Sequence, residues 1–537
     1  MASQRARRGL TAAALLTAGG LLLAACTSGT TPQPAGTGAD GAPQSGGTLI
    51  VGQYQEVTNF NPTRQYSWET WRIDRNIYET LVDEDLSSTD GVPEIIPKLA
   101  TSWDISDDAT TFTFHLREGV EFTDGTPFNA EAVEFNVRTF TDPDFEYYDE
   151  VAAGTMALVY GNLESFTVID EYTVEYTFKS PYLEFLRQIP NSGNAASGIF
   201  SPTAFKELGP EGLGDNPVGT GPFVFVERVR GERTVLERND DYWGEKALLD
   251  RVIFRPIQND QSRVAALQTG EVDLISRVPA DSVSTLEADG FAVPEQDNVP
   301  QIIYYQFNWD NEYVRDKRIR EALIHAIDRE GLAEQIYQGY ANPAYSILNQ
   351  GNEAHDPDVI DYEYDPELAK ELIADAGYES GEITINLITD AAGQPTAEWI
   401  QQNLQAVGIN VTLESYEWIA YGTRSQNLEP ADALRLGEWG YVTPDWLRIA
   451  YQFYTAPNGG EQYTSQETLD AIAAASANGD PDKRVELWQA ADEAWRADAT
   501  IIPLTSFNRY YALSPKVQGF VWPQQNHYDL SKVWLSE

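Results

Sequence analysis

The chain has 537 residues, of which 42% are hydrophobic, so it is long enough to form two or more lobes with cores of their own. Its 36 basic and 83 acidic residues give a formal net charge of −47, which argues against nucleic acid as a partner because phosphate binding requires a basic face. The single cysteine excludes an intramolecular disulfide and cysteine-based metal sites, and the four histidines lack the spacing of a ligand pair. We therefore expect no metal and no cofactor.

The first 25 residues are predicted to form a lipoprotein signal peptide. Three arginines precede an apolar run, Leu10 to Ala25, which is too short to span a bilayer as a stable helix. The run ends in Leu23-Ala24-Ala25-Cys26, which resembles the lipobox of bacterial lipoproteins. This resemblance implies that Cys26 is lipidated and becomes the mature N-terminus, with the lipid as the only attachment to the membrane.

Residues 26–47 are predicted to be the lipidated cysteine and a flexible tether, because Thr, Ser, Gly, Pro and Ala dominate them. A flexible chain of this length has a mean reach of roughly 25 Å. The expected location is therefore the outer face of the cytoplasmic membrane, on its extracytoplasmic or periplasmic side.

Beyond the tether, the apolar pattern alternates between that of strands and that of helices. Residues 111–116 and 174–178 alternate apolar and polar side chains as half-buried strands do, whereas 223–226 is apolar throughout and predicts a strand buried on both faces. Asp365-Pro366 and Asp480-Pro481 each predict the start of a helix, with a capping Asp before Pro. Helices and strands that alternate without a repeat are typical of an α/β fold.

A series of short motifs runs through the chain in a fixed order. They are Gly46-Gly47-Thr48-Leu49, Leu99-Ala100-Thr101-Ser102-Trp103, Asp124-Gly125-Thr126-Pro127, Gly219-Thr220-Gly221-Pro222-Phe223, Arg238-Asn239-Asp240-Asp241-Tyr242-Trp243 and Ala326-Ile327-Asp328-Arg329. Together they make the mature chain similar to the bacterial extracellular solute-binding proteins of family 5, the peptide-binding group of ABC importers. Each motif is interpreted as a turn, a bend or a local cap rather than as a ligand contact.

The resemblance implies an α/β fold of the periplasmic-binding-protein type, with two lobes that close around a ligand and an extra subdomain in lobe I. Two crossing strands would hinge the lobes, and Val299–Asn308 and Ala499–Ser506 are the expected hinge segments. The implied boundaries are 48–95, 201–300 and 501–537 for lobe I, 96–200 for its extra subdomain, and 301–500 for lobe II.

The resemblance also implies where a ligand binds. In the family, a tryptophan-containing segment and a loop of the form W-x-x-D-Y-x-x-P supply contacts, and the loop aspartate holds the α-ammonium of a peptide. Here Val442 stands in the place of that aspartate if Trp439 is the anchor, and Tyr441 does if the register shifts by one. In either register the ligand of the α-ammonium is missing, unless Glu438 or Asp445 substitutes for it. Arg424 is a candidate for a ligand carboxylate, because a guanidinium binds carboxylates bidentately. The expected contacts are Glu56, Tyr416, Trp418, Arg424, Trp439, Gly440, Tyr441, Val442, Thr443 and Asp445.

The implied function is that of a monomeric, non-enzymatic component that captures a peptide or oligopeptide and delivers it to an ABC permease and its ATPase. An oligosaccharide or another solute is the alternative, because the aromatic side chains near residues 416–454 could stack on sugar faces. A secreted hydrolase is a remote alternative, since the sequence contains no G-x-S-x-G motif, no phosphate-binding loop and no cysteine nucleophile.

Overall fold

The computed structural model describes residues 42–536 except 58, 65–66, 88, 90–91, 191–196, 360–361, 509 and 523–526. The predicted signal peptide, Cys26 and the tether as far as residue 41 lie outside the described residues. Among the helices of the described chain, none has the length and apolar character needed to cross a bilayer.

The first large sheet has six strands in the order β18-β11-β1-β10-β9-β8. β1 is parallel to both β10 and β11, so these three strands end at the same edge of the sheet. The strands are β1 (Thr48–Gln53), β8 (Phe223–Val229), β9 (Arg233–Arg238), β10 (Arg251–Pro256), β11 (Leu274–Ser276) and β18 (Tyr511–Leu513).

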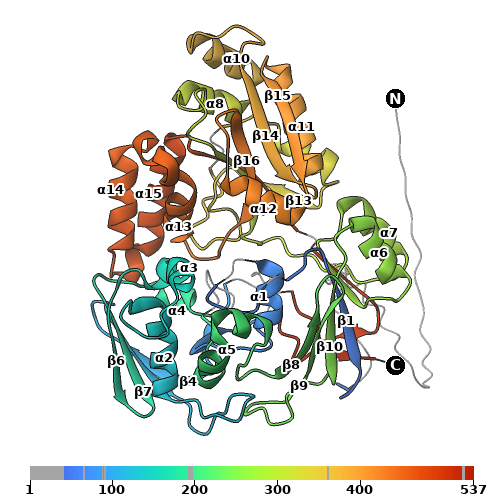
Figure 1. The fold of residues 1–537 in the computed structure, drawn as a ribbon. Coiled ribbons are helices and arrows are strands. Elements are labelled where there is room, and N and C mark those ends of the chain that lie inside the picture. The colour runs from blue at the N-terminus through green and yellow to red at the C-terminus, as the bar shows by residue number, and fades with distance from the viewer. Residues whose placement is uncertain are drawn as a thin grey trace, which may run out of the picture. The chain divides into compact units, whose positions relative to one another are not determined.

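The second large sheet has six strands in the order β13-β17-β12-β16-β14-β15. β14 is parallel to both β15 and β16, so these strands also end together, whereas β12 is antiparallel to its neighbours. The strands are β12 (Ile302–Phe307), β13 (Ala341–Pro343), β14 (Thr384–Asp390), β15 (Asn410–Tyr416), β16 (Asp432–Trp439) and β17 (Ile501–Phe507). We call the chain from β12 to β17 lobe II and the rest of the described chain lobe I (Figure 1).

A third sheet forms a separate part of lobe I. Its four strands are antiparallel in the order β4-β5-β7-β6: β4 (Ala100–Ile105), β5 (Thr111–Leu116), β7 (Thr173–Phe178) and β6 (Leu163–Asp170). Two short pairs complete the strands described: β2 (Val82–Glu84) with β3 (Ile95–Pro97), and β19 (Val517–Gln518) with β20 (Trp534–Leu535).

Helices flank these sheets in both lobes (Figure 1). Those of lobe I are α1 (Trp68–Asp74), α2 (Ala130–Thr141), α3 (Glu150–Tyr160), α4 (Phe185–Gln188), α5 (Pro202–Asp215), α6 (Asp260–Gln268) and α7 (Ala280–Ala288). Those of lobe II are α8 (Lys317–His325), α9 (Arg329–Gly331), η1 (Leu332–Ile336), α10 (Pro366–Asp375), α11 (Gln394–Ala406), α12 (Trp418–Gln426), α13 (Trp446–Ala450), η2 (Tyr451–Thr455), η3 (Pro457–Tyr463), α14 (Gln466–Ser476), η4 (Pro481–Lys483) and α15 (Arg484–Ala497).

The chain enters lobe II through β12 and leaves it through β17. These strands overlap the two predicted hinge segments and pair antiparallel in the second sheet. Ile501–Phe507 therefore pairs within the second sheet, and the predicted start of the lobe I return at residue 501 stays a prediction. The return to the first sheet begins one strand later, where β18 pairs with β11. The other predicted boundaries, and the hinge motion itself, stay predictions.

Local sequence patterns predict some of the strands correctly, but not the burial of every one. β5 and β7 alternate buried and partly buried side chains, which confirms the half-buried strands. The prediction for 223–226 is wrong in its burial: Phe223 is buried, but Val226 is 47% exposed. The reason is that β8 is the edge strand of the first sheet, so fewer neighbours cover it.

One predicted helix start is confirmed and the other is shifted. The Asp365 side chain caps α10 by accepting hydrogen bonds from the backbone N–H groups of Glu367 and Leu368, with Pro366 as the first helical residue. Asp480 instead caps the short 3₁₀ turn η4, and α15 begins only at Arg484. The second Asp-Pro pair therefore marks the turn that precedes the helix.

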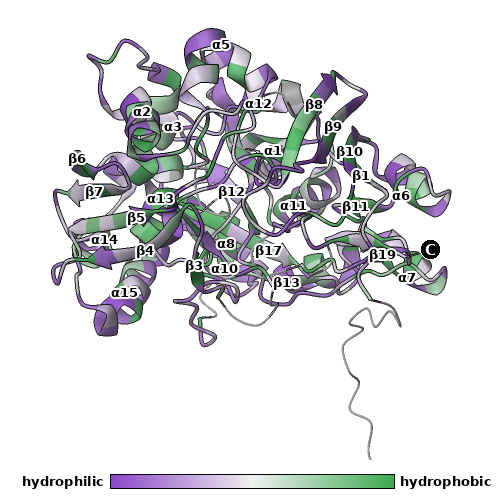
Figure 2. Ribbon diagram, turned by 90° about the horizontal axis from the view of Figure 1, so that it is seen from below, coloured by the Kyte–Doolittle hydropathy of each residue, from purple (hydrophilic) through white to green (hydrophobic). Residues whose placement is uncertain are grey.

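Hydrophobic cores lie against each large sheet, and a further core connects the lobes. That core joins Phe112 and Phe114 of β5 with Trp446 of α13 and Trp488 and Trp495 of α15. In Figure 2, green hydrophobic stretches follow strands such as β5 and β12, whereas purple hydrophilic residues gather on the outer helices and loops.

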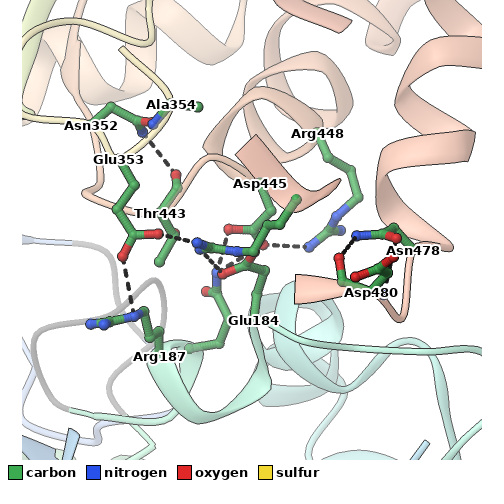
Figure 3. Close-up of polar contacts among 12 residues, drawn as sticks. Glu184, Arg187, Asn352, Glu353, Ala354, Thr443, Asp445, Arg448, Asn478 and Asp480 are labelled. Carbon is green, nitrogen blue, oxygen red and sulfur yellow. Dashed lines mark hydrogen bonds and ion pairs between the residues drawn. The ribbon is translucent and has the colours of Figure 1, made fainter. Parts of the chain in front are cut away.

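A polar cluster also connects the lobes (Figure 3). Arg484 of α15 donates a hydrogen bond of 2.6 Å to Glu184, beside α4, and also pairs with Glu353. Gln188 of α4 donates hydrogen bonds of 2.8 and 3.0 Å to the carboxylate of Asp445. We call these five residues the interlobe cluster.

The motif Gly219-Thr220-Gly221 has a packing role within lobe I. A Cβ on Gly219 would lie 2.2 Å from the carbonyl oxygen of Ile77, which is backbone and cannot move aside easily. The hydroxyl of Thr220 donates a 2.8 Å hydrogen bond to Glu79. The structure thus places this motif in packing and hydrogen bonding within lobe I.

Gly219→Ala is expected to lower the free energy of unfolding by about 1–3 kcal/mol, because the added methyl group forces the backbone near Ile77 to shift. Urea denaturation followed by circular dichroism measures the change. Gly154→Ala is the control, since it lies in α3 with no neighbouring atom within 4 Å of the added Cβ. That variant should be neutral or stabilised by up to about 1 kcal/mol, and equal losses in both variants would contradict the packing role.

Candidate functional site

A cavity of about 190 Å³ lies between the two lobes. Lobe I contributes Tyr54, Gln55, Ser67, Trp68, Trp71 and Arg277, and lobe II contributes Asp390, Trp418, Tyr421, Leu436, Gly437, Glu438 and Trp439. The cavity is therefore complete only when both lobes are in contact.

The cavity lies where parallel strands of both sheets end. In lobe II, Asp390 ends β14, Trp418 comes shortly after β15, and Glu438–Trp439 ends β16. In lobe I, Tyr54 follows β1 and Arg277 follows β11. In α/β proteins, ligands bind beyond the carboxyl ends of parallel strands, where the connecting loops converge. The topology therefore brings residues that are far apart in the sequence to one site.

Two helices give the cavity aromatic walls. On α1, Trp68 and Trp71 are three residues apart and their rings pack edge to face at 5.3 Å. On α12, Trp418 and Tyr421 have the same spacing, with ring centroids 6.2 Å apart. Trp418 is 38% exposed, whereas the other three are buried. Aromatic faces of this kind can contact apolar side chains or the flat face of a sugar.

The cavity also carries both signs of charge. The guanidinium of Arg277 lies 3.3 Å from Glu438 and 3.9 Å from Asp390, so it connects lobe I to two carboxylates of lobe II. Gln301 donates a 2.8 Å hydrogen bond to Glu438. Burial raises the pKa of Glu438 above its usual value, although the positive charge of Arg277 lowers it. A ligand that carries a carboxylate or an ammonium would find a partner of opposite charge here.

The described residues offer no obvious place for a metal ion. Among them, no group of three or more His, Cys, Asp or Glu side chains is arranged to hold one.

Of the predicted contact residues, the structure brings Trp418 and Trp439 to the cavity. Glu438, considered as a substitute for the missing aspartate, lines it as well. The other predicted residues lie elsewhere and have partners within the protein.

Arg424, Tyr416 and Glu56 each have a partner outside the cavity. Arg424 lies 2.7 Å from Asp432, whose side chain is fully buried, and it donates a hydrogen bond to the backbone of Asn427. The hydroxyl of Tyr416 donates a 2.6 Å hydrogen bond to Glu414. Glu56 accepts a 2.6 Å hydrogen bond from the backbone of Gly231.

The loop from Gly440 to Asp445 is buried behind the cavity. A Cβ on Gly440 would lie 2.1 Å from the carbonyl oxygen of Pro300. Asn352 donates hydrogen bonds to the carbonyl groups of Tyr441 and Thr443, and the backbone N–H of Glu353 donates to that of Val442. Asp445 accepts hydrogen bonds from Gln188 and lies 3.3 Å from Arg448. Of the two candidate substitutes, only Glu438 reaches the cavity.

Sequence reasoning missed the contribution of lobe I and the end of β14. Tyr54, Arg277 and Asp390 each stand at or just beyond the end of a short apolar strand, which is a signal that a parallel-sheet prediction could have used. Trp68 and Trp71 share one face of a short helix, but their segment has no motif that points to a ligand.

Residues 94–461, which are more than half of the chain, match the model of the family described as "Bacterial extracellular solute-binding proteins, family 5 Middle". The chain belongs to this family. The match confirms the resemblance inferred from the sequence motifs, and members of this family bind solutes outside the cell.

Individual family members are similar along most of their length. Heme-binding protein A of Haemophilus influenzae is 28% identical over 95% of this chain and 96% of its own. The dipeptide-binding protein of Escherichia coli is 27% identical over 88% of this chain and 92% of its own. The structure of the periplasmic binding protein DppA of Helicobacter pylori in complex with the peptide STSA covers 92% of this chain and 99% of its own, with a TM-score of 0.82 and 29% identity. These similarities confirm the two-lobe α/β fold.

Arg424→Ala is expected to lower the free energy of unfolding by about 3 kcal/mol, because it leaves the buried carboxylate of Asp432 without its cation. Urea denaturation measures the loss. Arg230→Ala is the matched control: Arg230 lies 3.0 Å from Asp215, but both side chains are more than half exposed. Its loss should stay below about 1 kcal/mol. A similar small effect in both variants would mean that Arg424 is not a structural residue.

Proposed function

We propose that this protein is the extracytoplasmic solute-binding component of an ABC importer and that it carries a short peptide in the cavity between its lobes. The observation that carries the peptide assignment is the combination of aromatic walls with one guanidinium and two carboxylates. A peptide offers apolar side chains together with an ammonium and a carboxylate, so each part of it has a suitable partner there. The dipeptide-binding relative and the peptide-bound neighbour support this ligand class.

An oligosaccharide is the second candidate, because the aromatic walls also suit the faces of sugar rings. A neutral sugar would offer no charge to Arg277, Asp390 or Glu438, which are largely removed from water. Buried charges are best matched by a ligand that is charged itself, so the peptide is favoured. Haem should be tested alongside peptides and sugars, because one relative is named for binding it.

The proposed transport cycle follows from the fold and the N-terminal sequence. The protein acts as a monomer anchored by a lipid on Cys26, on the outer face of the cytoplasmic membrane. The tether of residues 26–47 lets the lobes reach an ABC permease. Closure around the peptide precedes docking, and the permease with its ATPase then completes import.

A thermal-shift screen tests the ligand class. Its panel contains STSA, dipeptides, cello-, xylo- and malto-oligosaccharides, and haemin. A peptide at one hundred times its Kd should stabilise the protein by about 2.7 kcal/mol, whereas the sugars and haemin should leave it unchanged. Stabilisation by sugars or haemin without any response to peptides would refute the peptide proposal.

A cavity variant and a control variant test whether the peptide binds in the cavity. Trp439→Ala removes a cavity wall and should weaken peptide affinity by about tenfold or more in calorimetry, as loss of a central aromatic contact does. Arg255→Ala is the control, because Arg255 lies on β10 and pairs at the surface with Glu271. Equal affinities for both variants would show that the ligand binds elsewhere.

Cys26→Ser tests the anchor separately. Serine lacks the thiol that a lipid would be attached to, so the full-length variant should leave the membrane fraction and appear in the soluble extracytoplasmic fraction. Its unfolding temperature and ligand affinity should equal those of the wild-type protein, because the residues that line the cavity come from Tyr54 onward. Retention in the membrane, or loss of folding, would show that Cys26 has another role.

A further inference from the structure

Arg277 lines two spaces at the interface of the lobes. One is the cavity of about 190 Å³, and the other is a groove of about 790 Å³. Pockets for drug-sized ligands measure about 300–1,000 Å³, so the cavity alone suits a small ligand, whereas cavity and groove together would hold a larger one. A side chain that lines both spaces is placed to control how much of them a ligand uses.

The backbone holds Arg277 in an unusual conformation. Its φ is +51°, in the left-handed region that L-residues with a side chain rarely adopt. The buried guanidinium of Arg263 fixes this turn by donating hydrogen bonds to the carbonyl groups of Ser276, Arg277 and Ile257, at 3.0, 2.8 and 2.8 Å. The position of Arg277 is thus held by a neighbour that does not line either space.

The side chain of Arg277 is held less tightly than its backbone. Its guanidinium lies 3.3 Å from Glu438 and 3.9 Å from Asp390, and 5.1 Å from the ring centre of Tyr54. These ion pairs are longer than charge-assisted hydrogen bonds of 2.7–2.9 Å, and a second group can compete for the carboxylates. The side chain can therefore leave its place without disturbing the turn that carries it.

The groove beyond Arg277 has the composition of a surface for an extended chain. Both lobes present polar and apolar side chains: Gln258 and Val278 belong to lobe I, and Glu417 and Tyr337 belong to lobe II. Polar groups can contact the backbone of an extended peptide, and apolar groups can contact its side chains.

We propose that Arg277 is a specificity-determining residue that limits the length of the peptide. This inference rests on the proposed function. Short peptides are enclosed in the cavity behind the guanidinium, whereas longer peptides must displace Arg277 from Asp390 and Glu438 to extend into the groove. Displacement breaks the only ion pairs that Arg277 makes among the described residues, so affinity falls with length.

Calorimetry with a series from dialanine to pentaalanine tests the limit. In the wild type, affinity should fall about tenfold or more once the peptide outgrows the cavity. Arg277→Ala should remove that step, because no guanidinium then separates cavity and groove. Arg277→Lys keeps the charge but loses the planar guanidinium, so it should reduce the fall in affinity with peptide length. This variant also keeps the inference testable if Arg277→Ala fails to fold. Arg255→Ala should retain the wild-type profile, and an unchanged step in both Arg277 variants would overturn the inference.

A ligand-free measurement separates this inference from the proposed function. The cavity contains Trp68, Trp71, Trp418 and Trp439, so acrylamide should quench tryptophan fluorescence more strongly in Arg277→Ala and not in Arg255→Ala. Unchanged quenching would refute the division of the two spaces, whatever the ligand is. Increased quenching in a protein that binds no peptide would refute the proposed ligand class and leave the division intact.

Discussion

The shared edge of the parallel strands is the constraint on which the rest of this structure depends. β1 and β11 in lobe I, and β14, β15 and β16 in lobe II, send the residues that follow them toward the space between the lobes. A residue beyond the end of a strand no longer pairs within the sheet, so its side chain and backbone are available to a ligand. Tyr54 and Arg277 occupy such positions, Glu438 lies in the last two residues of β16, and the aromatic pairs of α1 and α12 complete the walls.

The fold could be predicted to the extent that its signals are local. The alternation in β5 and the capping Asp365 of α10 depend on a few neighbouring residues, and both are confirmed. The burial of β8 depends on the place of that strand in the sheet, which the segment itself does not encode. The same holds for Ile501–Phe507, whose lobe is decided by its pairing with β12. The order and spacing of the motifs predicted the family. Which strands are neighbours in each sheet could be learned only from the structure.

The predicted contacts that line the cavity belong to lobe II, which carries the most distinctive sequence. Trp418 and Trp439 were predicted because their segments resemble those that supply ligand contacts in the family, whereas the Arg277 turn has no such motif. Between Gly440 and Asp445 the sequence pattern predicts contacts, which stay a prediction; in the structure Val442 is fully buried, and Asp445 accepts hydrogen bonds from Gln188 of lobe I. Whether a polar loop residue faces a ligand or another lobe depends on tertiary packing, which a linear pattern cannot encode.

The two sets of polar contacts between the lobes differ in a way that bears on ligand binding. The interlobe cluster contains hydrogen bonds of 2.6 and 2.8 Å, whereas the ion pairs of Arg277 are 3.3 and 3.9 Å long. Glu438 and Asp445 lie on either side of Trp439 in one short stretch of chain, so both sets act on the same segment. A ligand shifts the balance between open and closed lobes only by its differential affinity for the two states. Contacts that already favour the closed state reduce what a ligand must supply, and the interlobe cluster supplies such contacts between the lobes, whereas the longer Arg277 pairs lie in the cavity lining itself.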